Sequence, residues 1–118
     1  MNFKTIEISG NGADVMLSKQ EIIDELSKNL NTWRVEYGVK RIGLFGSYNR
    51  DKQEELSDID VLVEFNASDI SFDNYMDLKI ILEDLFQKQI DLVILNDIKP
   101  ALKSDILSTI TYVTEDNQ

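Results

Sequence analysis

The sequence predicts an α+β fold in which a small mixed β-sheet packs against helices. Short apolar runs of strand length alternate with segments of helical periodicity along the 118 residues, which is the pattern of a mixed domain. The polar motifs Gly46-Ser47 and Asp58-Ile59-Asp60 stand beside apolar runs of this kind. The length fits one domain with a modest core and leaves no room for a separate substrate domain.

The first helix is expected to begin at Ser18 and to end at Gly38. Glu21 lies at the position that completes a capping box with Ser18, and glycine commonly closes a helix. Trp33 and Tyr37 lie on or near the apolar stripe, so we assign them to core packing and not to stacking on a base. The other residues of the stripe are Ile22, Ile23, Leu26 and Leu30.

Two apolar runs in the middle of the chain are predicted to form neighbouring strands. The first runs over residues 39–45 and ends at the Gly-Ser motif. The second follows the Asp-x-Asp motif and is interrupted by Glu64; its apolar residues are Val61, Leu62, Val63 and Phe65. The connecting segment 49–57 is rich in charge, so we expect a solvated loop.

The rest of the chain is expected to hold a helix at 71–87, a strand at 89–95, a helix starting near Pro100 and a brief strand at 111–113. The strand carries a single acid, Asp91, which would be costly to bury without a partner. The apolar face of the 71–87 helix is wide enough to suggest burial on two sides. That face consists of Phe72, Tyr75, Met76, Leu78, Ile80, Ile81, Leu82, Leu85 and Phe86.

Residues 1–17 form an extension ahead of the domain at 18–118. A short alternation of apolar and polar residues predicts an extra strand, and the following Gly10-Asn11-Gly12 predicts a loop. This extension could pair with the sheet edge, mediate a homo-oligomer or be disordered, and the sequence does not choose among these.

Asp58 and Asp60 are candidate metal ligands. Alternate residues of a strand project to the same face, roughly 6–7 Å apart, so the two side chains should point together. Ionised carboxylates on one face repel unless a cation or donors lie between them, and hard oxygen ligands suit Mg²⁺ or Mn²⁺. The alternative is that one of them caps a turn, since Ser-Asp is common in loops.

Gly46 and Ser47 are candidate phosphate ligands. Glycine lets the backbone approach a phosphate closely, and serine adds a hydroxyl and an amide donor. Arg50 follows closely enough to contact a phosphate or the substrate. Its alternative role is a surface ion pair with Asp51 or Glu54, which would contribute little energy.

These motifs together resemble the minimal nucleotidyltransferases of the DNA polymerase β-like superfamily. The matching segments are residues 44–50, 57–65 and 90–93, which follow the family's order and approximate spacing. The resemblance covers about residues 18–113. It departs at Asn49-Arg50-Asp51, where the family often carries Ala-Arg-Gly, so an acidic side chain stands in place of a loop glycine.

The resemblance implies a polymerase β-like core, ATP as the nucleotide donor and one or two Mg²⁺ ions, for which Mn²⁺ could substitute. The nucleotide ligands that it implies are Gly46, Ser47 and Arg50. The metal ligands and catalytic residues that it implies are Asp58, Asp60 and Asp91. Asp91, on a different strand from the pair, would also orient or deprotonate the acceptor hydroxyl.

The composition excludes several other kinds of chemistry. With 22 acidic and 12 basic residues the net charge is −10, which disfavours free nucleic acid as a partner. The absence of cysteine excludes disulfides and thiolate sites, and the absence of histidine leaves acid-base chemistry to carboxylates, Lys or Tyr. Neither a signal peptide nor a bilayer-spanning apolar run is recognisable, so we expect a soluble cytoplasmic protein without a membrane partner.

The leading hypothesis, inferred from the resemblance, is a Mg²⁺-dependent protein adenylyltransferase that acts as an antitoxin. Minimal members of the family are often encoded beside HEPN-domain toxins and transfer AMP from ATP to a tyrosine of that partner. One alternative is a weakly active or inactive antitoxin that binds nucleotide and acts by complex formation. Another is nucleotidyl transfer to a small molecule. Such enzymes usually have additional substrate-binding structure, for which this chain has few residues.

Overall fold

The computed structural model describes residues 17–50 and 58–114. Its sheet is four-stranded, in the order β3-β2-β1-β4, with β2 and β3 parallel and β1 antiparallel to both β2 and β4. The strands are β1 (Val39–Phe45), β2 (Ile59–Phe65), β3 (Ile90–Ile94) and β4 (Thr111–Tyr112). The helices are α1 (Lys19–Tyr37), α2 (Gly46–Asn49), α3 (Phe72–Phe86) and α4 (Pro100–Thr109), with single 3₁₀ turns η2 (Ala67–Asp69) and η3 (Leu95–Asp97). The predicted α+β fold with a mixed sheet is confirmed.

Local capping signals determine where α1 and α3 begin. The Ser18 hydroxyl accepts a hydrogen bond from the Glu21 amide at 3.1 Å, and the Glu21 carboxylate accepts one from the Ser18 amide at 2.8 Å. Gly38 closes α1 with φ of 72°, a left-handed conformation that glycine adopts without penalty. At the start of α3, the Ser71 hydroxyl accepts a hydrogen bond from the amide of Asn74 at 3.1 Å. The predicted limits of both helices are confirmed.

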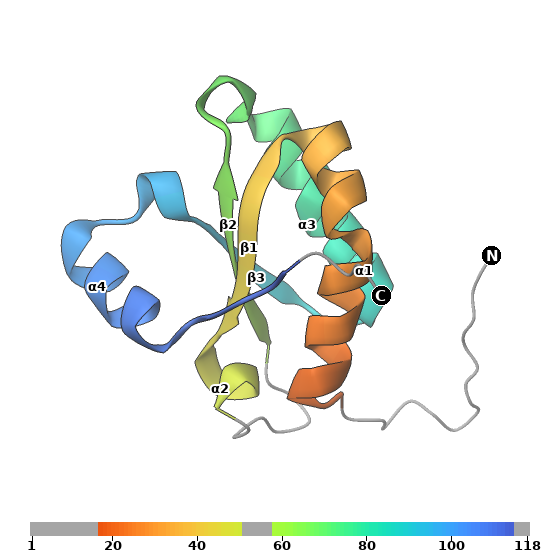
Figure 1. Cartoon of the computed structure of the whole chain (residues 1–118), viewed down its shortest axis with the longest axis vertical. Coiled ribbons are helices and arrows are strands. Elements are labelled where there is room, and N and C mark those ends of the chain that lie inside the picture. Colours follow the sequence, from red (N-terminus) through yellow and green to blue (C-terminus); the bar gives the residue numbers. More distant parts are fainter. Residues whose placement is uncertain (1–16, 51–57, 115–118) are drawn as a thin grey trace.

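The sheet separates two unlike layers. Helices α1 and α3 lie together on one side, whereas α4 lies on the other (Figure 1). Ile59, Val61 and Val63 of β2 join the core beneath α1 and α3. Because side chains alternate along a strand, Asp60 and Glu64 project from the opposite face. The acidic residues of β2 therefore lie on the side of the sheet that α4 only partly covers.

The wide apolar face of α3 is buried on one side only. Leu78, Leu82 and Phe86 are the buried residues of this helix, while Phe72 is 74% exposed and Ile80 is 56% exposed. The expectation of burial on two sides is therefore wrong. The reason is the architecture, because a helix in the outer layer of a two-layer domain contacts the sheet along a single stripe.

Helix α3 also supplies hydrogen bonds to the outer edge of β3. The Tyr75 hydroxyl donates to the Leu92 carbonyl at 2.9 Å, and the Lys79 ammonium donates to the Ile90 carbonyl at 3.0 Å. The Glu83 carboxylate accepts from the Ile90 amide at 3.3 Å. These contacts satisfy backbone groups that an edge strand would otherwise offer to another chain.

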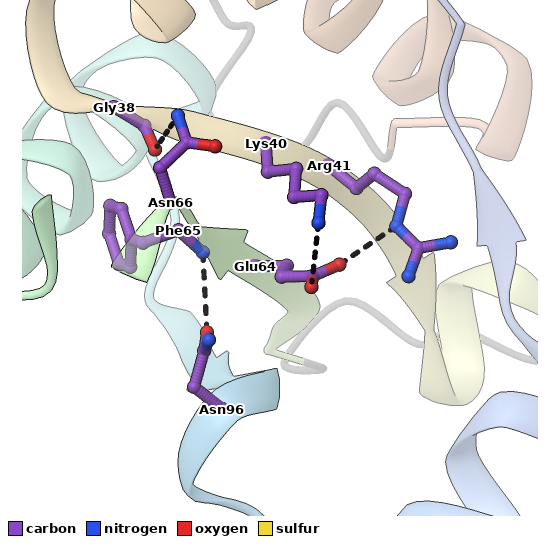
Figure 2. Close-up of polar contacts among 7 residues, drawn as sticks. All are labelled: Gly38, Lys40, Arg41, Glu64, Phe65, Asn66 and Asn96. Atoms are coloured by element: carbon purple, nitrogen blue, oxygen red, sulfur yellow. Dashed lines mark hydrogen bonds and ion pairs between the residues drawn. The ribbon is translucent and has the colours of Figure 1, made fainter. Parts of the chain in front are cut away.

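Strands β1 and β2 are also joined by an ion-pair cluster at the Glu64 end of β2 (Figure 2). Glu64 lies 2.8 Å from the Nε of Arg41 and 3.8 Å from the Nζ of Lys40. Beyond the strand, the Asn66 side-chain amide donates to the Gly38 carbonyl at 3.2 Å. Glu64 is thus paired with two cations, and it lies four residues from Asp60 on the same face of the sheet.

Some predicted features lie outside the described residues. These are the extra strand and loop predicted within residues 1–16, the segment 51–57 with Asp51, and the tail at 115–118. Among the residues that the structure describes, no helix combines the length and the apolar character needed to cross a membrane.

Candidate active site

The sheet register brings the separate sequence motifs together. Asp60 of β2 is paired with Asp91 of β3 and, on its other side, with Phe45 of β1. Neighbouring strands lie about 4.8 Å apart, so the two carboxylates stand side by side on one face. Gly46 directly follows Phe45. The candidate site thus lies at the amino-terminal ends of the parallel strands β2 and β3 and at the carboxyl end of β1.

Gly46 is in direct contact with the carboxylate of Asp60. Its φ is 76°, and a Cβ atom built at this position would lie 1.9 Å from Oδ2 of Asp60. Any larger residue would therefore be strained in its backbone and would also displace the carboxylate. From the sequence, Gly46 was expected to allow close approach of a phosphate. In the structure, its lack of a side chain leaves room for the carboxylate of Asp60.

Asp60 is the most perturbed carboxyl group of the candidate site. Burial, followed by the charge of Asp91, a hydrogen bond with Asp91 and the charge of Asp58, raises its pKa from about 3.8 to about 6. Arg50 opposes these effects with its positive charge. Three other predicted site residues, Asp91, Asp58 and Arg50, thus act electrostatically on Asp60. Asp60 and Asp91 repel when both are ionised.

The two acids of β2, Asp60 and Glu64, have different electrostatic surroundings. Both acids belong to β2 and project to the same face, but Glu64 is paired with Lys40 and Arg41. Asp60 instead has Asp91 as its register partner. Carboxyl groups whose pKa is raised in this way are typical of sites that bind a metal or move a proton. The Asp60 end of the strand is accordingly the candidate functional end.

Two of the expectations for the carboxylates need correction. Asp58 was expected on the same strand as Asp60, but it lies just before β2 and is exposed. Asp91 has a larger effect than Asp58 on the pKa of Asp60. Asp91 is also exposed, whereas its apolar run suggested burial. The reason is that side chains alternate along β3, so Asp91 faces away from the core while its neighbours Ile90 and Leu92 are buried in it.

Helix α2 contains features that sequence reasoning missed. Asn49 was assigned to a solvated loop, but it is buried, and its side-chain amide donates to the Thr109 carbonyl at 2.6 Å. This bond ties the end of α2 to the end of α4. Tyr48 is fully buried in the core. An aromatic residue directly after the Gly-Ser motif was the available signal, because it anchors the turn that presents Gly46 and Ser47.

The donor chemistry of the site fits a hard divalent cation. Carboxylate oxygens are the ligands that Mg²⁺ prefers, and an ion would relieve the repulsion that raises the pKa of Asp60. Within residues 17–50 and 58–114, no three acidic side chains already converge as ligands of one ion. The structure contains the Asp60–Asp91 pair, and participation of Asp58 as a third ligand remains a prediction.

A mixed sheet with a glycine turn against paired carboxylates defines the chain as a nucleotidyltransferase of the polymerase β type. The chain belongs to the family described as polymerase beta, nucleotidyltransferase, whose model matches residues 16–118. The resemblance to minimal nucleotidyltransferases, recognised from the motifs, is confirmed.

The chain is similar to proteins with an assigned activity. It is 35% identical over 98 residues to the protein adenylyltransferase MntA of Thermococcus cleftensis, covering 83% of this chain and 98% of MntA. It is 41% identical over 86 residues to the protein MJ0435 of Methanocaldococcus jannaschii, covering 73% of this chain and 91% of that protein. These are similarities over nearly the whole length of both relatives.

Solved structures share the fold at lower identity. A chain of a toxin-antitoxin complex with AMP-PNP superposes with a TM-score of 0.61 at 23% identity, covering 76% of this chain and 73% of that chain. A chain of the complex between tri-AMPylated Shewanella oneidensis HEPN toxin and MNT antitoxin also gives a TM-score of 0.61, at 21% identity, covering 83% and 73% of the two chains. At this identity the likeness establishes the fold.

The pKa of Asp60 predicts a pH-dependent gain in stability for Asp60→Asn. A carboxyl group with a raised pKa binds its proton more tightly when folded, so its ionisation weakens folding as the pH rises from about 4 through about 6. In metal-free buffer at pH 7.5, Asp60→Asn should raise the free energy of unfolding by roughly 1–2 kcal/mol. The gain should vanish near pH 4. Urea unfolding across this pH range is the measurement, and a constant difference would contradict the assignment.

The contact between Gly46 and Asp60 predicts that Gly46→Ala is destabilising. The added methyl group meets the Asp60 carboxylate and the backbone is held at positive φ, so a loss of about 1–3 kcal/mol is expected. The double variant Gly46→Ala/Asp60→Gly should recover part of this loss, because the clash with the carboxylate is gone. Thermal unfolding of both variants tests this, and equal stability of Gly46→Ala and the parent would refute the close contact.

Proposed function

We propose that this protein is a Mg²⁺-dependent adenylyltransferase that transfers AMP from ATP to a tyrosine hydroxyl of a HEPN-type toxin, and so acts as its antitoxin. The observation that carries the proposal is the Asp60–Asp91 pair, which the sheet register places side by side, with Asp60 against Gly46. Such a pair requires a proton or a cation, and a nucleotide brought with Mg²⁺ would supply the cation.

The nucleotide would be held at the β1 side of the site. Gly46 and Ser47 offer backbone and hydroxyl donors to the triphosphate, and the Arg50 guanidinium offers charge-assisted hydrogen bonds. The influence of Arg50 on the pKa of Asp60 supports this role, because it indicates that the positive charge acts at the carboxylate cluster. Bound Mg²⁺, held by Asp58, Asp60 and Asp91, would neutralise charge on the phosphate oxygens during transfer.

Asp91 is assigned to the acceptor side. It is exposed and lies on the edge strand, where an incoming hydroxyl can reach it, whereas Asp60 is wedged against Gly46. Asp91 would take the proton of the tyrosine hydroxyl as that oxygen forms a bond to the α-phosphorus. The bond from the α-phosphorus to the bridging oxygen breaks, and pyrophosphate leaves with the bonding electrons. One AMP is then esterified to the acceptor.

The nature of the acceptor is supported by the relatives. MntA of Thermococcus cleftensis is a protein adenylyltransferase at 35% identity, and the Shewanella oneidensis complex contains a HEPN toxin that carries AMP groups beside its MNT antitoxin. An acidic chain of net charge −10 is also better suited to a protein partner than to free nucleic acid.

The test is modification of the protein encoded by the neighbouring gene, which the proposal expects to be a HEPN-domain toxin. Incubation of the two proteins with ATP and Mg²⁺ should add the mass of one or more AMP groups to the partner, measured by intact-mass spectrometry. Asp60→Asn should slow the transfer by about 100-fold or more, because the charge that holds the metal is lost. Removal of Mg²⁺ with EDTA should abolish the transfer.

The matched control is Asp77→Asn, which removes an exposed carboxylate from α3 and should leave the rate unchanged. Circular dichroism of Asp60→Asn serves to establish whether the variant is folded. Transfer at the parental rate by folded Asp60→Asn would overturn the assignment of the site. A stable complex of the two proteins without any modification would instead favour an antitoxin that acts by binding alone.

A further inference from the structure

An open groove of about 580 Å³ begins at the candidate active site. Its floor is β3 from Asp91 to Ile94, and its opposite wall is formed by Leu102 and Ile106 of α4. In Figure 1, α4 stands apart from the sheet on the side away from α1 and α3. The volume falls in the range of about 300–1,000 Å³ that is typical of pockets burying a ligand. Most of the residues that line the groove are apolar, and its charged residues are Asp91, Asp97 and Lys99.

The position of the groove assigns it to the acceptor side of the reaction. The candidate phosphate turn at Gly46 adjoins β1, whereas Asp91 belongs to β3, which is two strands away in the sheet. In phosphoryl-type transfer the attacking and leaving oxygens lie roughly in line. An acceptor that gives its proton to Asp91 must therefore arrive from the β3 side. The groove extends from Asp91 along β3, and Phe45, the residue before Gly46, also lines it.

The edge of β3 cannot receive the acceptor by strand addition at its first residues. Ile90 has both its amide and its carbonyl bonded to side chains of α3, and the Leu92 carbonyl is bonded to Tyr75. A docking segment must therefore use side chains placed in the groove and not backbone pairing with these groups. The apolar lining selects an apolar or aromatic side chain for this purpose.

We propose that the groove between β3 and α4 binds the acceptor protein, by burying an apolar or aromatic side chain adjacent to the modified hydroxyl. This inference rests on the proposed function. Leu102 is a specificity-determining residue in this view, because it is 57% exposed in the free protein and becomes covered when the acceptor docks. The adenylyl donor contacts the opposite side of the carboxylate pair and is independent of Leu102.

The experiment compares Leu102→Glu with Leu107→Glu in steady-state transfer of AMP to the HEPN-domain partner. Both leucines are on α4 and partly exposed, at 57% and 37%, and both variants add one negative charge, but Leu107 does not line the groove. Leu102→Glu should raise KM for the partner about tenfold or more, with KM for ATP within about twofold of the parent. Leu107→Glu should match the parent in both. Leu102→Ser is a milder variant, which should raise KM for the partner less.

Each other outcome contradicts the proposal in a distinguishable way. A parental KM for the partner in folded Leu102→Glu would overturn the groove as the docking site while leaving the proposed function intact. A raised KM for ATP would show that the groove holds the adenine base instead. An equal effect of Leu107→Glu would indicate general charge repulsion. Absence of transfer by the parent protein itself would overturn the proposed function, and with it this inference.

Discussion

The repulsion between the carboxylates of Asp60 and Asp91 is the interaction on which the functional end of this protein depends. The parallel register of β2 and β3 holds the two residues side by side, and Gly46 lets the turn at Gly46-Ser47 close against Asp60. Burial prevents water from screening the charges fully, and the result is a carboxyl pKa near 6. The fold thus holds together two carboxyl groups whose repulsion a proton or a cation would relieve.

The remainder of the sheet stabilises this arrangement with ordinary interactions. Glu64 is balanced by Lys40 and Arg41, and the apolar face of the sheet is covered by α1 and α3 (Figure 1). Because stability is provided by these parts, the Asp60 end can tolerate an unfavourable interaction. Functional sites often contain groups that lower the stability of the protein. In β2, the paired Glu64 and the repelled Asp60 differ in this way.

Local signals in the sequence were sufficient for most of the fold. The capping residues Ser18 and Ser71 and the left-handed Gly38 determine helix limits through contacts within a few residues. Burial was harder to predict because it depends on the layers. The apolar residues Phe72 and Ile80 of α3 are exposed, since periodicity reveals an apolar face but not whether a second layer covers it.

The candidate site was predictable in its composition but not in its internal contacts. The resemblance placed Asp60 and Asp91 at one site, and the register agrees with that expectation. The coupling of Asp60 to Asp91 depends on the parallel register of β2 and β3, which local sequence does not reveal. The groove beside Asp91 is formed by α4, so no local pattern in the sequence could have revealed it.

The most direct test of the central claim is titration of the Asp60 carboxyl group by carbon-detected NMR, with and without Mg²⁺. The account predicts a pKa near 6 in the metal-free protein. Addition of Mg²⁺ should lower this pKa, because the cation binds the ionised carboxylate and competes with its proton. An ordinary aspartate pKa that does not respond to Mg²⁺ would contradict the account, since Asp60 would then be neither strongly coupled to Asp91 nor part of a metal site.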